Sequence, residues 1–257
     1  FLQYHFSKQW EKLKDYANSK EIKIIGDIPI YVAYDSSDVW AHTNLFNLDE
    51  NLLPVTVAGC PPDFFSPTGQ LWGNPIYKWN LMEQNNYSWW IGRIRHSFEI
   101  YDIVRIDHFR GFEAYWEIPF GSENAINGKW VKGPGIRFFE TIKSNLGKLD
   151  IIAEDLGYLT EEVRDLISNT GLPGMKVLQF AFDSGDDSEY LPHNYIGNCV
   201  AYTGTHDNET AMGWFNNLKP SQREYVGKYL NLSYNEGISW GMIRAIWASC
   251  AYLAIAP

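Results

Sequence analysis

The chain has 257 residues, of which 45% are hydrophobic and 20% are charged, and its formal net charge is −10 at pH 7. This length and composition are typical of one globular domain with a full core, and an α/β barrel often has about this size. The negative charge argues against nucleic acid or an anionic membrane as a partner. Three widely spaced cysteines predict a reduced, intracellular compartment. No apolar run is long enough to predict a membrane span.

The first predicted element is a helix whose apolar residues recur at helical spacing, so that one face is expected to be buried. These residues are Phe6, Trp10, Leu13 and Ala17. A strand is expected from Ile22 to about Ile30. Residues 31–86 then form a long stretch rich in proline, glycine and aromatic residues, which predicts irregular structure. A loop of that length in a compact domain is usually functional.

The later elements alternate between helical and strand patterns, with a second irregular region at 108–135. Helices are expected near 87–101, 136–146, 210–217 and 220–230, and from about Ile238 onward. Strands are expected at 103–106, 151–153, 175–182, 199–202 and 251–256. Thr160 is the expected N-cap of a further helix, because Glu161 and Glu162 follow it in the first turn.

Four of the predicted strands lead into a carboxylate, namely Asp27, Asp107, Glu154 and Asp207. Helical patterns separate these strands, which predicts a parallel sheet of the (β/α)8 TIM-barrel class. The C-terminal ends of barrel strands converge on one mouth, where the chemistry takes place. At most six strands can be counted, so the prediction is an incomplete barrel, and we expect residues 1–257 to be part of a catalytic domain in a longer protein.

The segment from Val104 to Gly111 carries the sharpest motif, VRIDHFRG. Arg105 and Asp107 are two residues apart in a strand and therefore point to the same side, where they can pair. Pairing would keep Asp107 ionised and oriented, as a nucleophile requires. The alternative is a structural ion pair at the rim of the barrel.

The next two acids complete a set that suits glycoside chemistry, which needs separate acid and base roles. Glu154 lies beside an ionised Asp107, so its pKa should rise and favour a role as general acid. Alternatively, Glu154 or Asp155 merely caps the helix that follows. Asp207 has His206 as a neighbour, but the spacing of the histidines matches no zinc motif, so no metal site is expected.

The segment from Gly59 to Pro75 mixes aromatic rings, including Phe64 and Phe65, with amides and one acid. Rings can stack on sugars while polar side chains bind hydroxyl groups. The polar candidates are Asp63, Gln70 and Asn74. The alternative is a proline-stiffened lid that packs on itself. Trp89 and Trp90, by contrast, lie in a helical pattern and are expected in the core.

Together these segments resemble the amylomaltase family of 4-α-glucanotransferases, in the α-amylase-like clan of barrels. The motifs that carry the resemblance extend over the whole chain. They are GDIPIYVAYDSSDVW (26–40), PPDFFSPTGQLWGNPIY (61–77), VRIDHFRGFEAYWEIP (104–119), INGKWVKGPG (126–135), IIAEDLG (151–157), LPGMKVLQFAFD (172–183) and YTGTHDNET (202–210).

The resemblance implies a role for each matching residue. Asp107 matches the nucleophile, Glu154 the acid/base and Asp207 the carboxylate that stabilises the transition state. The residues implied to bind substrate or to support the site are Arg105, His206, His108, Asp27, Asp63, Gln70, Trp72 and Asn74. It also implies that the chain holds about strands 3 to 7 and the start of strand 8 of the barrel, with substrate-binding loops at about 31–86 and 108–135.

The implied function is transfer of α-1,4-glucan segments between maltooligosaccharides through a covalent glycosyl-enzyme, with retention of configuration. Retention requires the carboxyl groups of Asp107 and Glu154 to lie ~5–5.5 Å apart. A hydrolase of the same clan and a non-catalytic glucan-binding protein are the alternatives. We expect glucans as partners, no cofactor, and a bacterial cytoplasmic location, with the plastid as the other possibility.

Overall fold

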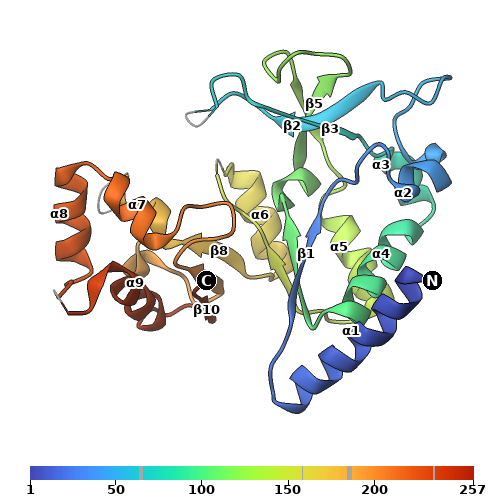
Figure 1. The fold of residues 1–257 in the computed structure, drawn as a ribbon. Coiled ribbons are helices and arrows are strands. Elements are labelled where there is room, and N and C mark those ends of the chain that lie inside the picture. The colour runs from blue at the N-terminus through green and yellow to red at the C-terminus, as the bar shows by residue number, and fades with distance from the viewer. Residues whose placement is uncertain (64–65, 158, 184–186, 234) are drawn as a thin grey trace. The chain divides into compact units, whose positions relative to one another are not determined.

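A computed structural model of the chain describes residues 1–63, 66–157, 159–183, 187–233 and 235–257. The chain divides into two compact units, Phe1–Gly171 and Leu172–Pro257. Each unit contains a three-stranded parallel sheet with helices in the connections, and the first unit also contains a four-stranded antiparallel sheet (Figure 1). The predicted α/β class with parallel strands is therefore confirmed.

The parallel sheet of the first unit has the order β1-β4-β7, and its strands are β1 (Ile25–Pro29), β4 (Ile103–Asp107) and β7 (Ile151–Ala153). Asp107 ends β4 and Glu154 directly follows β7, as predicted. The expected start of the first strand at Ile22 was wrong, because pairing with β4 begins at Ile25 and Asp27 lies in the middle of β1. Asp27 is thereby placed opposite Arg105.

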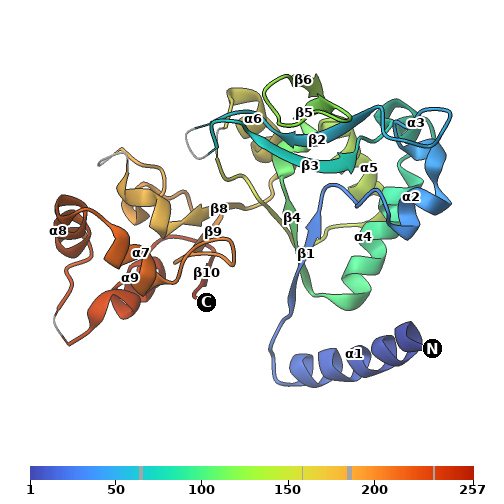
Figure 2. The same ribbon diagram turned by 45° about the horizontal axis from the view of Figure 1, so that its top comes forward.

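Four longer helices belong to this unit, namely α1 (Leu2–Ser19), α4 (Ser88–Ile100), α5 (Ile136–Leu146) and α6 (Glu161–Thr170). Their predicted positions are confirmed, and Thr160 is the N-cap residue of α6. The prediction that α1 buries its apolar stripe was wrong, because Phe6 and Leu13 are 55% and 51% exposed and Ala17 is only partly buried. In this unit α1 packs beside the end of α4 through Trp10, whose indole donates to the carbonyl of Ile100 at 2.8 Å (Figure 2).

The two regions predicted to be irregular contain a shared antiparallel sheet, so that prediction was wrong. Residues 31–86 contain α2 (Ser37–Ala41), η1 (Thr43–Leu45), β2 (Thr56–Cys60), β3 (Gln70–Pro75) and α3 (Trp79–Gln84). Residues 108–135 contain η2 (Phe109–Phe112), β5 (Ala114–Pro119) and β6 (Lys129–Lys132). The strand order is β3-β2-β5-β6. Because β2 pairs with β5 across a long sequence separation, and glycine and proline interrupt these strands, no local alternation revealed them.

The core of the first unit is dominated by aromatic rings. Trp90, Phe112 and Phe138 are completely buried, and the rings of Phe112 and Phe138 stack with centroids 4.7 Å apart. The expectation that Trp90 belongs to the core is confirmed, whereas Trp89 beside it is only partly buried. Much of the high aromatic content in this unit therefore serves packing rather than sugar binding.

The second unit has a parallel sheet in the order β10-β9-β8, formed by β8 (Gly174–Val177), β9 (Cys199–Tyr202) and β10 (Leu253–Ile255). Its helices are α7 (Ala211–Asn217), α8 (Pro220–Tyr229) and α9 (Gly237–Trp247), with short turns η3 (Leu178–Phe182) and η4 (Pro192–Asn194). These helices and the last strand are as predicted. The strand expected to reach Phe182 ends at Val177, because the 3-10 turn carries Leu178, Ala181 and Phe182 into a cluster with the helices.

In the part of the chain that the structure describes, no helix has both the length and the apolar character needed to cross a membrane.

Candidate active site

Arg105 joins two carboxylates on neighbouring strands. Its Nη1 donates to Asp27 Oδ2 at 2.6 Å, and its Nη2 donates to Asp107 Oδ1 at 2.9 Å. Burial acts to lower the pKa of Arg105, but the two carboxylates outweigh it and raise that pKa above its ordinary value. The predicted pairing of Arg105 with Asp107 is confirmed. Because the guanidinium is rigid, the Asp107 carboxylate is held in one orientation at the end of β4.

Glu154 is buried at the end of β7, next to the end of β4, where Ile106 pairs with Ala153. Its Oε2 accepts the backbone N–H of His108 and its Oε1 accepts that of Leu156, both at 2.7 Å. Burial is the main cause that raises the pKa of Glu154 to about 7. The Leu156 hydrogen bond opposes this shift and the charge of Asp107 adds to it.

The predicted direction of the Glu154 shift is thus found in the structure, although desolvation contributes more than the neighbouring charge on which the prediction relied. A carboxyl group with a pKa of about 7 is partly protonated near neutral pH and can both give and take a proton. The alternative that Glu154 or Asp155 caps the following helix was wrong, because α6 has Thr160 as its N-cap residue.

His108 connects Glu154 to strand β3. Its backbone adopts a left-handed conformation with φ of 52°, which points its N–H at Glu154. Its ring meets Trp72 edge to face, with centroids 4.7 Å apart. Burial, helped by the charge of Arg110, lowers the pKa of His108 to about 3, so the imidazole stays neutral. Its Nε2 is buried and has no hydrogen-bond partner among the described residues, which leaves one polar atom unsatisfied beside the acids.

The residues predicted to bind hydroxyl groups bond to other groups of the protein, and two of them, Gln70 and Asn74, lie in β3. Gln70 Oε1 accepts from the indole of Trp72 at 3.0 Å, and Asp63 Oδ1 accepts the backbone N–H of Ser66 at 2.7 Å. Asn74 Nδ2 donates to the carbonyl of Val32 at 2.9 Å. Phe64 and Phe65 lie outside the described residues. The alternative of a lid that packs on itself therefore describes the contacts of Gln70 and Asp63, whereas Asn74 bonds to Val32 outside the segment and Trp72 reaches His108.

The hairpin that carries this loop lies close to the two acids. Burial raises the pKa of Cys60, at the end of β2, to about 12, and the carboxylates of Asp63, Glu154 and Asp107 contribute to the rise. Cys60 was not among the predicted site residues. The sequence signal that could have indicated it is its position at the end of an apolar run, like the acids themselves.

Asp207 and His206 lie in a turn of the second unit that follows β9. Asn208 Oδ1 accepts from both the backbone N–H and the hydroxyl of Thr205 at 2.9 Å, which holds the turn. His206 Nε2 is 3.4 Å from Asp207 Oδ2, and the two side chains are 70% and 71% exposed. Since the other acids belong to the first unit, the predicted meeting of Asp207 with Asp107 and Glu154 stays a prediction. The same holds for the predicted spacing of the Asp107 and Glu154 carboxyl groups.

Gln179 supports this turn and was missed by the sequence reasoning. The side chain is buried, and its Nε2 donates to the carbonyl of Glu209 at 2.9 Å. A Cβ at Gly204 would lie 2.7 Å from the same nitrogen, so a larger residue there would have to displace the Gln179 amide from this contact. A lone glutamine within the apolar run 177–182 was the available signal.

The arrangement in the first unit defines an α/β protein with a clamped carboxylate beside a protonatable one, a pair suited to glycoside chemistry. The family described as 4-alpha-glucanotransferase matches residues 1–257. The chain is 57% identical to a 4-alpha-glucanotransferase of Clostridium butyricum over 99% of this chain and 53% of that protein. It is 49% identical to a chloroplastic/amyloplastic 4-alpha-glucanotransferase of Solanum tuberosum, over 99% of this chain and 44% of that protein.

A solved structure of amylomaltase from Streptococcus agalactiae in complex with acarbose is similar to this chain with a TM-score of 0.96 and 48% identity, covering 99% of this chain and 52% of that one. The chain therefore belongs to the 4-alpha-glucanotransferase family. It spans about half the length of the curated relatives that it matches.

Proposed function

We propose that the protein to which this chain belongs is a 4-α-glucanotransferase, an enzyme that moves α-1,4-glucan segments from one maltooligosaccharide to another. The observation that carries the proposal is the pair formed by Asp107, clamped by Arg105, and the buried Glu154 with its pKa near 7. Membership of the family supports the choice of α-1,4-glucans as substrates.

In the first step, Asp107 attacks the anomeric carbon of a glucose unit while Glu154 gives its proton to the departing glycosidic oxygen. The C–O bond to the leaving glucan breaks and a β-linked glycosyl-enzyme forms. Arg105 positions the attacking carboxylate, and the buried setting of Glu154 keeps the proton available near neutral pH.

In the second step, the 4-hydroxyl group of another glucan displaces Asp107, and Glu154 takes the hydroxyl proton. Two inversions restore the α configuration. Asp207 and His206 supply the remaining contacts to the sugar, with Asp207 binding the hydroxyl groups more tightly in the oxocarbenium-like state than in the ground state. The neutral His108 and the indole of Trp72 border the same sugar, and Asp27 holds Arg105 in place.

The fold proposed for the whole catalytic domain is a (β/α)8 barrel to which both parallel sheets contribute. The parallel strands in each unit and the similarity to amylomaltase support this proposal. The antiparallel sheet formed by regions 31–86 and 108–135 is then an insertion that borders the glucan groove. Strands 3 to 7 and the start of strand 8 of the barrel would lie in this chain.

The proposed location is the bacterial cytoplasm, which the three widely spaced cysteines and the bacterial relatives support. The plastid is the alternative, supported by the name of the chloroplastic/amyloplastic relative from Solanum tuberosum.

Product analysis tests the proposed activity. The full-length protein is incubated with maltotriose, and both the oligosaccharides and the total reducing ends are measured over time. Transfer yields longer and shorter oligosaccharides at a constant number of reducing ends. A steady rise in reducing ends would instead identify a hydrolase, and binding without any new product would identify a glucan-binding protein.

A further inference from the structure

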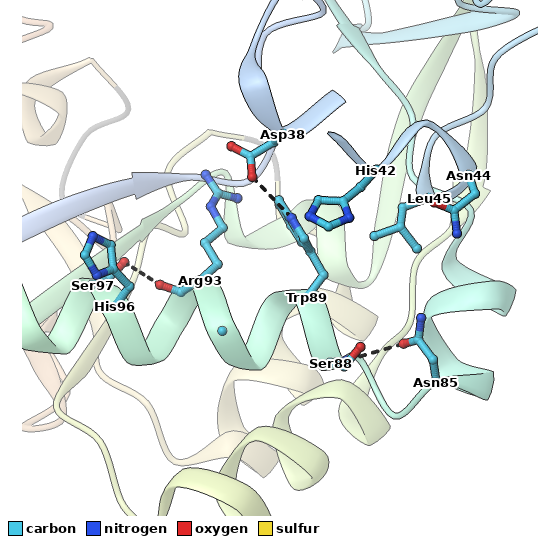
Figure 3. Close-up of a pocket in the computed structure, with 11 residues that line it drawn as sticks. Asp38, His42, Asn44, Leu45, Asn85, Ser88, Trp89, Arg93, His96 and Ser97 are labelled. Carbon is cyan, nitrogen blue, oxygen red and sulfur yellow. Dashed lines mark hydrogen bonds between the residues drawn. The ribbon is translucent and has the colours of Figure 1, made fainter. Parts of the chain in front are cut away.

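A cavity lies on the first unit, between the α2–η1 segment and α4. Its volume is about 620 Å³, and Figure 3 shows Trp89 rising from α4 toward Asp38 and His42. Asn44 and Arg93 also line it. The residues that line the cavity are different from those assigned to the candidate active site. Cavities of roughly 300–1,000 Å³ are the usual size for small-molecule sites.

The guanidinium group that lines this cavity belongs to Arg93, and it donates hydrogen bonds to backbone carbonyl groups of the protein. Arg93 Nη1 donates to the carbonyl of Ile30 at 3.2 Å and Nη2 to that of Pro29 at 2.7 Å. Its guanidinium carbon lies 4.7 Å from the centroid of the Trp90 ring. Arg93 thus ties α4 to the end of β1 and stacks on Trp90, and the charge of Asp38 acts on it electrostatically. Because both terminal nitrogens of Arg93 already donate to carbonyl groups, the cavity is poorly suited to an anionic ligand.

The polar groups that remain match a neutral, hydroxyl-rich ligand. Asp38 Oδ1 accepts from the indole of Trp89 at 3.2 Å, while Asp38 Oδ2 accepts no hydrogen bond from the described residues. The imidazole of His42 and the amide of Asn44 follow Asp38 along the same α2–η1 segment and also line the cavity (Figure 3). A carboxylate oxygen and an amide, placed beside an aromatic ring, can bind adjacent hydroxyl groups while the ring contacts the C–H groups of a sugar.

Gly92 keeps this cavity open. It lines the cavity from within α4, although glycine inside a helix costs about 0.5–1 kcal/mol relative to alanine. Packing does not require glycine at this position, because a Cβ built there meets no described atom within 4 Å. The glycine therefore weakens the helix at a position where packing does not require it, and it leaves open space beside the cavity.

We propose that this cavity is a second, non-catalytic binding site for an α-glucan chain. The proposal rests on the proposed function, because α-1,4-glucans are the neutral, hydroxyl-rich compounds that such an enzyme meets. A chain held here stays attached to the enzyme while another segment reacts, and long glucans benefit more than short ones.

The test is isothermal titration calorimetry of the full-length protein with maltoheptaose, in an Asp107→Asn background that prevents turnover. Two binding sites per chain are expected. Gly92→Trp, which fills the cavity, should abolish one of them and leave the other within about twofold in affinity. The matched control is Gly227→Trp, because Gly227 is also a helix glycine whose Cβ would meet no described atom within 4 Å, and it belongs to α8 of the second unit and does not line this cavity. The control should keep both sites.

A second variant removes ligand contacts without filling the cavity. His42→Ala combined with Asn44→Ala changes two exposed side chains, and should weaken the second site about tenfold while thermal unfolding is unaltered. Identical titrations for Gly92→Trp and Gly227→Trp would overturn the proposal. A wild-type protein that binds maltoheptaose at both sites but transfers no glucan from maltotriose would retain the second site and overturn the proposed function instead.

Discussion

Asp107 ends one parallel strand and Asp207 comes after another, but the two units hold these carboxylates by different means. Asp107 is 43% exposed and bonded to a buried guanidinium group that also binds a neighbouring strand. Asp207 is 71% exposed and its carboxylate lies 3.4 Å from the ring nitrogen of the adjacent His206. The side chain of Asn208 holds the turn by hydrogen bonds to Thr205. An acid that must attack one carbon atom needs a fixed orientation, which long-range pairing provides. An acid that grips hydroxyl groups can be presented by a local turn.

The largest effect that tests this comparison is on the clamped acid. Asp107→Asn in the full-length enzyme removes the charge and the nucleophile while it preserves the shape of the side chain. We expect the rate of maltotriose disproportionation to fall by roughly 10⁴-fold or more, because the covalent route is lost. Steady-state kinetics measures this fall. Near-normal turnover would show that Asp107 is not the nucleophile.

The next effect concerns the proton that Glu154 carries. Glu154→Gln keeps the size of the side chain and one carbonyl oxygen, which can accept only one of the two backbone N–H groups of His108 and Leu156, and it supplies no transferable proton. We expect a loss of roughly 10²–10⁴-fold in kcat, the usual contribution of general acid–base catalysis. A substrate whose leaving group departs without protonation, such as a maltosyl fluoride, should react with a much smaller loss. Equal losses on both substrates would argue against a role as general acid.

The dependence on pH follows from the direction of the Glu154 shift. Because burial raises the pKa of Glu154 to about 7, the protonated acid needed for the first step disappears as the pH rises through that value. The logarithm of kcat/KM should therefore fall with a slope of about −1 per pH unit between about pH 7.5 and pH 9. This fall of kcat/KM at high pH should be absent in Glu154→Gln. A flat profile for the wild type over this range would contradict the assignment.

The smallest effect is on stability and contrasts the two ion pairs directly. Arg105→Met leaves Asp27 and Asp107 close together without their shared cation. We expect it to lower the free energy of unfolding by about 2 kcal/mol, less than the roughly 3–5 kcal/mol typical of fully buried pairs, since both carboxylates are partly exposed.

His206→Ala provides the matched comparison in the second unit. Because His206 and Asp207 are both largely exposed, its removal should change the free energy of unfolding by less than about 0.5 kcal/mol. Urea denaturation of the full-length variants measures both differences. Equal costs for the two substitutions would mean that the long-range clamp contributes no more than a surface contact.

Local pattern was sufficient for many elements of this fold. The helix α5 was predicted with its bounds, and α7, α8 and β10 within one or two residues, because apolar spacing and capping residues are encoded within a few positions. The antiparallel sheet was missed because β2 and β5 are far apart in the sequence and make their hydrogen bonds only in the folded chain. Likewise, Phe6 and Leu13 follow the helical spacing of a buried stripe, yet they are exposed in α1.

The sequence alone determined that Asp107, Glu154 and Asp207 lie at or after the ends of apolar strands. It also determined that Arg105 and Asp107 share one side of β4, since alternation along a strand is a property of the backbone. Only the tertiary structure decided that Arg105 also binds Asp27, that the Asn74 side chain donates a hydrogen bond to the carbonyl of Val32, and that burial raises the pKa of Glu154. These outcomes depend on which strands become neighbours and how much water remains around a side chain. Neither is encoded in residue spacing.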